Sequence, residues 1–94
     1  MKKILYLHLK GKYFDQIKAG TKVEEYRRCS TYWQNRLFHR AYDYDEIHIM
    51  KGYPKKNDHT RRLIFPWNGY KVKVITHPEF GSQPVAVCAI KLKT

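Results

Sequence analysis

The stretch around Gly20 constrains the fold of this chain most strongly, because it joins a short helical pattern to a charged, extended segment. In residues 13–19 the apolar side chains Tyr13, Phe14 and Ile17 recur at the spacing of one helix face. Gly20 follows at the position where the C-terminus of a helix favours a residue that tolerates positive φ. The sequence therefore predicts a short amphipathic helix that ends in a turn at Gly20.

Five polar or charged side chains follow this turn within six residues: Lys22, Glu24, Glu25, Tyr26 and Arg27. If the segment is extended, Glu25 and Arg27 project to one face and Tyr26 projects to the other. Lys22 has the opposite parity to Glu25 and Arg27, so it joins them only if a turn or bulge intervenes. An exposed ion pair between Glu25 and Arg27 would contribute less than about 1 kcal/mol. The spacing alone therefore favours a helix followed by a strand with a surface ion pair.

Gly20, Lys22, Glu25 and Arg27 fit the pattern G-x-K-x-x-E-x-R. In this pattern, and in the helix before it, the chain resembles the ASCH (activating signal cointegrator homology) family. The resemblance implies that residues 1–94 form a single ASCH-like domain. It also implies a PUA-like fold, which is a small β-barrel with helices at its ends.

Apolar runs and turn signals predict the remaining elements. Thr31 and Gln34 fit a capping box for a second short helix that ends at Leu37. The first apolar run is nearly continuous and indicates a strand buried on both faces, and Asn68-Gly69 predicts a hairpin. Strands are expected over residues 4–9, 47–49, 62–67, 70–75 and 84–92. About five strands, with two short helices gathered near the N-terminus, indicate an α+β domain, while closure into a PUA-like β-barrel is implied by the resemblance.

The strongest compositional feature is positive charge. Nineteen Lys and Arg against eight Asp and Glu give a formal net charge of +11. A small domain this basic attracts polyanions, so a nucleic acid or a phosphorylated ligand is the expected partner. One loop concentrates this charge and is a candidate for phosphate contacts through Lys55, Lys56, Arg61 and Arg62.

Other classes of site are less well supported by the sequence. Cys29 and Cys88 form no C-x-x-C pair and have no zinc-ligand spacing, and Cys88 is expected in the core. Asp43, Asp45 and Glu46 lack a Gly-punctuated loop or paired histidines, so we expect a solvated turn, with no metal and no cofactor. The chain shows no secretion signal and no membrane span, which predicts a cytoplasmic protein with reduced thiols.

The preferred interpretation is a domain that binds nucleic acid, RNA above DNA, or a modified nucleotide in a pocket lined by Lys22, Glu25 and Arg27. Lys22 and Arg27 would then contact a phosphate or a carbonyl, and Glu25 would accept from an exocyclic amine or orient Arg27. A base would stack on Tyr26, or on a neighbouring Tyr53 or Trp67.

An enzyme is the alternative. Some small ASCH proteins that this chain resembles remove the acyl group from N4-acetylcytidine, and others are described as ribonucleases. The resemblance would make Lys22 and Glu25 the catalytic pair, but Glu25 occupies the position where the amidohydrolases have threonine. A later acid could come from Asp58 or Glu79. A third interpretation gives the Lys–Glu–Arg cluster a structural role, in which it fixes the helix to the barrel.

Overall fold

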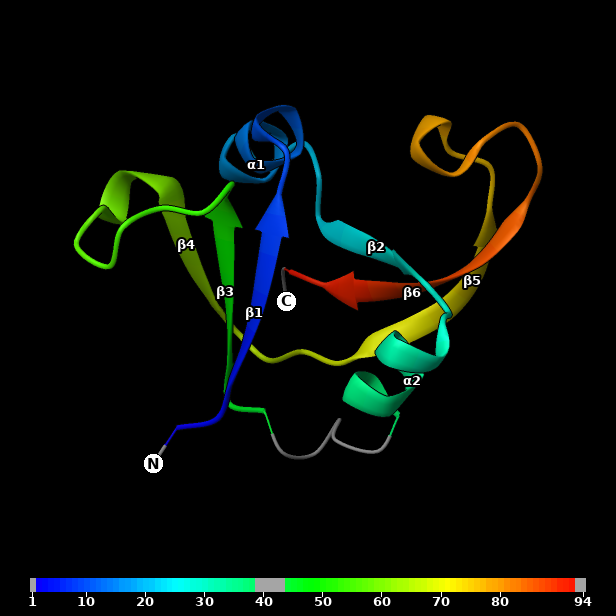
Figure 1. Ribbon diagram of the computed structural model, residues 1–94, viewed down its shortest axis with the longest axis horizontal. Helices are drawn as coiled ribbons and strands as arrows, with labels where there is room; N and C mark the ends of the chain where they lie inside the picture. Colours follow the sequence, from blue (N-terminus) through cyan, green and yellow to red (C-terminus); the bar gives the residue numbers. More distant parts are fainter. Residues whose placement is uncertain (1, 39–43, 93–94) are drawn as a thin grey trace.

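The computed structural model describes residues 2–38 and 44–92. They form an α+β domain with both α-helices in its first half (Figure 1). In chain order the elements are β1 (Ile4–Leu9), α1 (Gly11–Lys18), β2 (Glu24–Arg28), α2 (Thr31–Leu37), β3 (Glu46–Lys51), the 3-10 turn η1 (His59–Arg61), β4 (Arg62–Pro66), β5 (Tyr70–Ile75), the 3-10 turn η2 (Pro78–Phe80) and β6 (Val85–Lys91). The described residues form six strands, since the segment after Gly20 is extended, as its spacing favoured, and adds β2 to the five strands expected elsewhere.

The six strands form two open sheets of three strands each, in the orders β1-β3-β4 and β2-β6-β5. No closed barrel is present in the described part of the chain, which corrects the closure that the family resemblance implied. The core lies between the two sheets and under the two helices. Its buried cluster comprises Leu5, Leu7, Leu9, Phe14, Ile17, Leu37, Ile47, Ile49, Cys88, Ile90 and Leu92.

The first sheet has one buried and one exposed face. β1 pairs in parallel with β3, with Leu7 opposite Ile49, and β4 pairs antiparallel with β3 on its other side. Leu7 is 1% exposed, whereas its neighbour Tyr6 is 46% exposed. The prediction that the first strand is buried on both faces was therefore wrong, because no helix or strand of the described residues covers the outer face of Tyr6 and His8.

The second sheet places β6 at its centre, with antiparallel β2 and β5 at its edges. Residues 87–90 of β6 are fully buried, since one face meets the core and the other is covered by side chains of the two neighbouring strands. The prediction of a mostly buried final strand is confirmed. On β5, by contrast, Val72 and Val74 are exposed.

Asn68-Gly69 does not close a hairpin, which corrects the prediction. The strand before it, β4, pairs with β3, and the strand after it, β5, pairs with β6. The segment therefore carries the chain from one sheet to the other, and Gly69 supplies the positive φ of 81° that this crossing uses. Pro66 lies on the edge strand β4, as expected from its missing N–H.

Both helix ends near the site are fixed by local hydrogen bonds. After α1, Gly20 adopts the predicted positive φ, 82°, and the chain turns toward β2. The N-cap of α2 is Ser30, one residue before the predicted Thr31, because the Ser30 hydroxyl accepts from the Trp33 N–H at 3.3 Å. Gln34 instead donates its side-chain amide to the Cys29 carbonyl.

Candidate functional site

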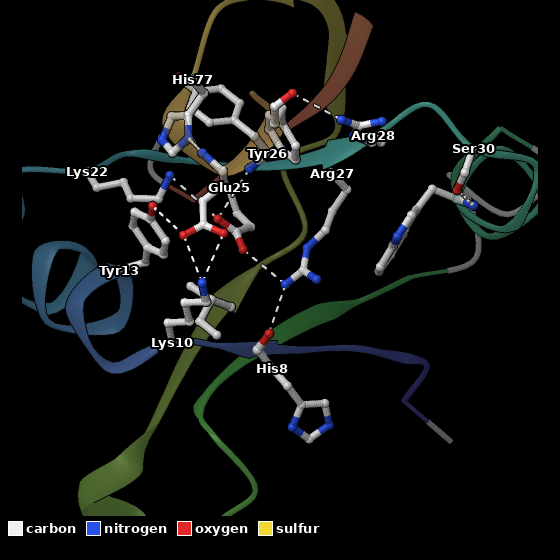
Figure 2. Close-up of a pocket in the computed structure, with 14 residues that line it drawn as sticks. His8, Lys10, Tyr13, Lys22, Glu25, Tyr26, Arg27, Arg28, Ser30 and His77 are labelled. Carbon is white, nitrogen blue, oxygen red and sulfur yellow. Dashed lines mark hydrogen bonds and ion pairs between the residues drawn. The ribbon is translucent and has the colours of Figure 1, made fainter. Parts of the chain in front are cut away.

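A cavity of about 460 Å³ opens between the two sheets, beside β2 (Figure 2). β1 and β2 are each an edge strand of their own sheet, and in the described chain no ladder joins them. The end of β1, the start of α1, the beginning of α2 and the η2 turn supply the remaining walls. The cavity therefore occupies the gap between the edge strands β1 and β2, which we call the seam between the two sheets.

Glu25 lies at the centre of this site. It is opposite the buried Ile90, so its side chain projects from the core face of β2, and the residue is 8% exposed. One carboxylate oxygen, Oε1, lies 3.5 Å from Lys22 Nζ and also accepts from the Tyr26 N–H at 3.2 Å. The other, Oε2, accepts from Arg27 Nη2 at 3.0 Å. A buried carboxylate is thus held by two cations and one backbone donor, and the predicted exposed ion pair is instead a partly buried cluster.

Lys22 joins the cluster because it precedes β2. The N–H groups of Thr21 and Lys22 both donate to the Gln16 carbonyl, which forms the turn between α1 and the strand. Lys22 therefore lies outside the strand, and strand parity does not govern its side chain. The turn precedes Lys22, whereas one was expected between Lys22 and Glu25. Its ammonium also lies over the ring of Tyr26, 4.5 Å from the centroid, and 5.6 Å from that of Tyr13. The faces of the two rings and the Glu25 carboxylate therefore all attract the positive charge of Lys22.

Arg27 bridges the open seam. Its Nη2 donates to the main-chain carbonyl of His8, on β1, at 3.0 Å, in addition to Glu25. The guanidinium also lies over the ring of Trp33, 5.2 Å from the centroid. Nε is buried and has no hydrogen-bond partner among the described residues. A side chain thus takes the place of a strand-to-strand hydrogen bond, and one donor nitrogen is left unsatisfied.

Tyr26 projects from the opposite face of β2, as predicted, and its hydroxyl donates to Glu24 Oε1 at 3.2 Å. Lys73, on β5, donates to the same carboxylate at 2.8 Å, and this hydrogen bond lowers the pKa of Glu24. Burial raises the pKa of the Tyr26 phenol. The Tyr26 ring nevertheless lines the cavity. β2 is an edge strand, so side chains from both of its faces can reach the space beside it.

A second set of lining residues comes from the start of α1 and from η2, and of these the sequence indicated only Glu79, as a possible later acid. Glu79 accepts from Lys10 Nζ at 2.9 Å and from the Tyr13 hydroxyl at 3.1 Å, and the hydrogen bond from Lys10 lowers the pKa of its carboxyl. His77 and Phe80 line the same wall. No local pattern links these segments, which are 66 residues apart in the case of Tyr13 and Glu79. In total, four Lys and Arg and two Glu side chains line the cavity, an excess of two positive charges.

The predicted basic loop does not line the cavity. Lys55, Lys56 and Arg61 are exposed, and Arg61 Nε lies 3.6 Å from Asp58. Arg62 begins β4 and lies 3.5 Å from the ring nitrogen Nδ1 of His48, on the outer face of the first sheet. These four side chains could therefore contact a ligand that extends beyond the cavity, but not a ligand confined to it.

The described residues contain no group of three or more His, Cys, Asp or Glu side chains that could hold a metal ion. Asp43, of the acidic turn, lies outside the described residues, while Asp45 accepts from the Lys3 N–H and Glu46 pairs with Lys2. Cys88 is buried in the core, as predicted. Its sulfur lies 3.4 Å from that of Cys29, and burial raises the pKa of the Cys88 thiol to about 12.

No family model matches this chain, and neither a curated protein nor a solved structure matches it significantly. No helix in residues 2–38 and 44–92 has the length and apolar character needed to cross a membrane.

Proposed function

We propose that this chain is a cytoplasmic domain that binds single-stranded nucleic acid, RNA in preference to DNA, and holds one unpaired nucleotide in its cavity. One observation carries the proposal: a buried carboxylate fixes two cations, Lys22 and Arg27, on the wall of a cavity with aromatic sides. Its volume of about 460 Å³ suits a ligand of nucleotide size, since small-molecule sites typically measure about 300–1,000 Å³.

Lys22 and Arg27 are the groups that contact the nucleotide in this proposal. Each has further N–H donors available to a phosphate or carbonyl oxygen, because among the described residues Lys22 forms an ion pair only with Glu25, and Arg27 uses Nη2 alone for its hydrogen bonds to Glu25 and the His8 carbonyl. Glu25 already accepts from two cations and from the Tyr26 N–H, so its principal role is to hold the two cations in place. Of the two roles considered for Glu25, the proposal therefore favours orienting Arg27 over accepting a hydrogen bond from an exocyclic amine of the base.

The surroundings favour an anionic, aromatic ligand. The cavity carries an excess of two positive charges, and the whole chain carries +11, which draws polyanions toward it. Tyr13, Tyr26 and Trp33 offer ring surface to a base. The likeness of Gly20, Lys22, Glu25 and Arg27 to the ASCH pattern agrees with binding of this kind.

Fluorescence anisotropy tests the proposal with labelled RNA and DNA of one sequence, about eight nucleotides long. We expect binding that weakens between about 50 mM and 200 mM salt, because phosphate contacts release counterions. Lys22→Met should weaken binding by about tenfold or more, as expected for a charge-assisted hydrogen bond. Lys71→Gln removes the same charge at an exposed position on β5. It should weaken binding by about twofold or less, because salt screens the interaction of an exposed charge. Equal losses in both variants, or no binding at low salt, would refute the proposal.

Hydrolysis is the second candidate, and the position of Glu79 favours it. This carboxylate shares the cavity with Lys22, as a catalytic acid would. Two nearby hydroxyls are committed elsewhere, since Thr21 donates to the Gln16 carbonyl and Ser30 caps α2. We therefore expect weak or no release of cytidine from N4-acetylcytidine. Rapid release that is lost in Lys22→Ala would reverse the order of the two functions.

A further inference from the structure

His8 connects the cavity to the outer face of the first sheet. Its main-chain carbonyl accepts from Arg27 inside the cavity, at 3.0 Å. Its ring points away from the cavity (Figure 2) and is exposed, because β1 alternates between core and outer face. A ligand that leaves the cavity past the His8 carbonyl therefore meets the face that carries the His8 ring.

The His8 ring is held in a fixed orientation on that face. Its Nδ1 lies 2.8 Å from the Gly52 carbonyl, which can only accept, so Nδ1 carries a proton and donates. The Gly52 N–H in turn donates to the Leu9 carbonyl at 2.9 Å, and Gly52 has a positive φ of 65°. These contacts fix the start of the β3–β4 loop against the end of β1, and they place Tyr53 directly over the histidine.

Tyr53 stacks on the His8 ring, with centroids 4.3 Å apart and an angle of 23° between the planes. The residue is nevertheless 87% exposed, so the other face of its ring is open to solvent. The other aromatic candidates lack such a face: Lys22 lies over Tyr26, and Trp67 packs on the core beside Tyr44. An aromatic ring that is supported on one face and open on the other is the arrangement on which a base of a single strand stacks.

Positive charge continues beyond this ring. Lys55 and Lys56 follow Tyr53 by two and three residues, both are exposed, and neither forms an ion pair with a described carboxylate. The cavity, the His8–Tyr53 stack and the two lysines thus follow one another along the end of the first sheet. This order matches the alternation of bases and phosphates along a single strand.

We propose that Tyr53, supported by His8, forms a second nucleotide subsite, which takes the base adjacent to the nucleotide in the cavity, and that Lys55 and Lys56 receive the phosphates beyond it. This inference rests on the function proposed above. It adds that recognition extends over more than one nucleotide, and that the strand leaves the cavity over the carbonyl of His8 toward the β3–β4 loop.

Calorimetric titration tests the subsite with the four ribonucleoside monophosphates and the corresponding homo-trinucleotides. Tyr53→Ala should leave monophosphate affinity within about twofold of wild type, and should weaken the trinucleotide by about 5- to 150-fold, the loss expected for one stacked base. Tyr53→Phe keeps the ring and should keep trinucleotide affinity. Tyr6→Ala removes another exposed ring, one that contacts His48 instead of His8, and should have no effect on either ligand.

The outcomes separate the two proposals. If the monophosphate binds but the trinucleotide binds no more tightly, or if Tyr53→Ala does not affect the trinucleotide, the second subsite is refuted and the cavity proposal stands. Equal weakening of both ligands by Tyr53→Ala also refutes the subsite, because the ring would then act on the cavity through His8. If wild type binds neither ligand, the proposed function itself fails and the subsite fails with it.

Discussion

Replacing Glu25 by glutamine tests whether the buried carboxylate holds the site together. Glu25→Gln keeps the size of the side chain and an oxygen acceptor, but it removes the negative charge between Lys22 and Arg27. At 3.0–3.5 Å and an effective dielectric constant of about 20, each attraction is worth roughly 5 kcal/mol before the cost of desolvation. The cost of desolvating the three charged groups cancels most of that attraction. The expected loss of stability is therefore based on the effect of removing one partner from a buried ion pair.

Removing one partner of a fully buried pair typically costs about 3–5 kcal/mol, because the remaining charge has no counter-charge. Here the side chains of Lys22 and Arg27 are 12% and 23% exposed, so water compensates in part. We therefore expect Glu25→Gln to lower the free energy of unfolding by about 2–3 kcal/mol. In a domain of this size that corresponds to a fall in Tm of roughly 10–20 °C.

Urea unfolding monitored by circular dichroism measures this loss, with Asp15→Asn as the matched control. Asp15 pairs with Lys51 at 3.2 Å, but the two side chains are 60% and 40% exposed, so the control should lose less than about 1 kcal/mol. Adding Lys22→Met to Glu25→Gln removes one of the two uncompensated cations and should recover part of the stability. If Glu25→Gln is no less stable than Asp15→Asn, the carboxylate does not hold the two cations and the reasoning fails.

Three further results are expected. Neutralising Lys55 and Lys56 together should make the slope of log K against log salt less steep by about 1.4 on a single strand, and an unchanged slope would remove these lysines from the interface. Cys88 should not react with iodoacetamide at neutral pH in the folded protein, because burial raises the pKa of its thiol to about 12. Denaturant should expose the thiol and allow it to react. Rapid labelling of the native protein would contradict this prediction. The hydrogen bond from Lys73 lowers the pKa of Glu24 in the folded protein from its ordinary value of 4.5. This pair therefore stabilises the fold above pH 4.5, and its contribution is lost as the pH falls through the pKa of Glu24 in the folded protein. Glu24→Gln should therefore flatten the loss of Tm as the pH falls below about 4.5, and equal pH profiles would exclude the effect.

The sequence by itself determined the elements that depend on neighbouring residues. The apolar spacing in residues 13–19 and the glycine after them predicted α1 and its end at Gly20, because periodicity and positive φ are local properties. The same reasoning placed Cys88 in a buried strand. The motif also identified Lys22, Glu25 and Arg27, and the structure places all three on one cavity.

The tertiary structure decided which strands pair and what the seam between the sheets contains. Asn68-Gly69 has the sequence of a tight turn, yet the strands on either side of it belong to different sheets, because pairing depends on distant partners such as β3 and β6. The burial of Glu25 and the arrival of Glu79 opposite α1 likewise depend on contacts between segments far apart in the chain. Alternation along β2 gives the side on which a residue projects, but whether that side meets water, a core or a cavity is set by the element packed against it.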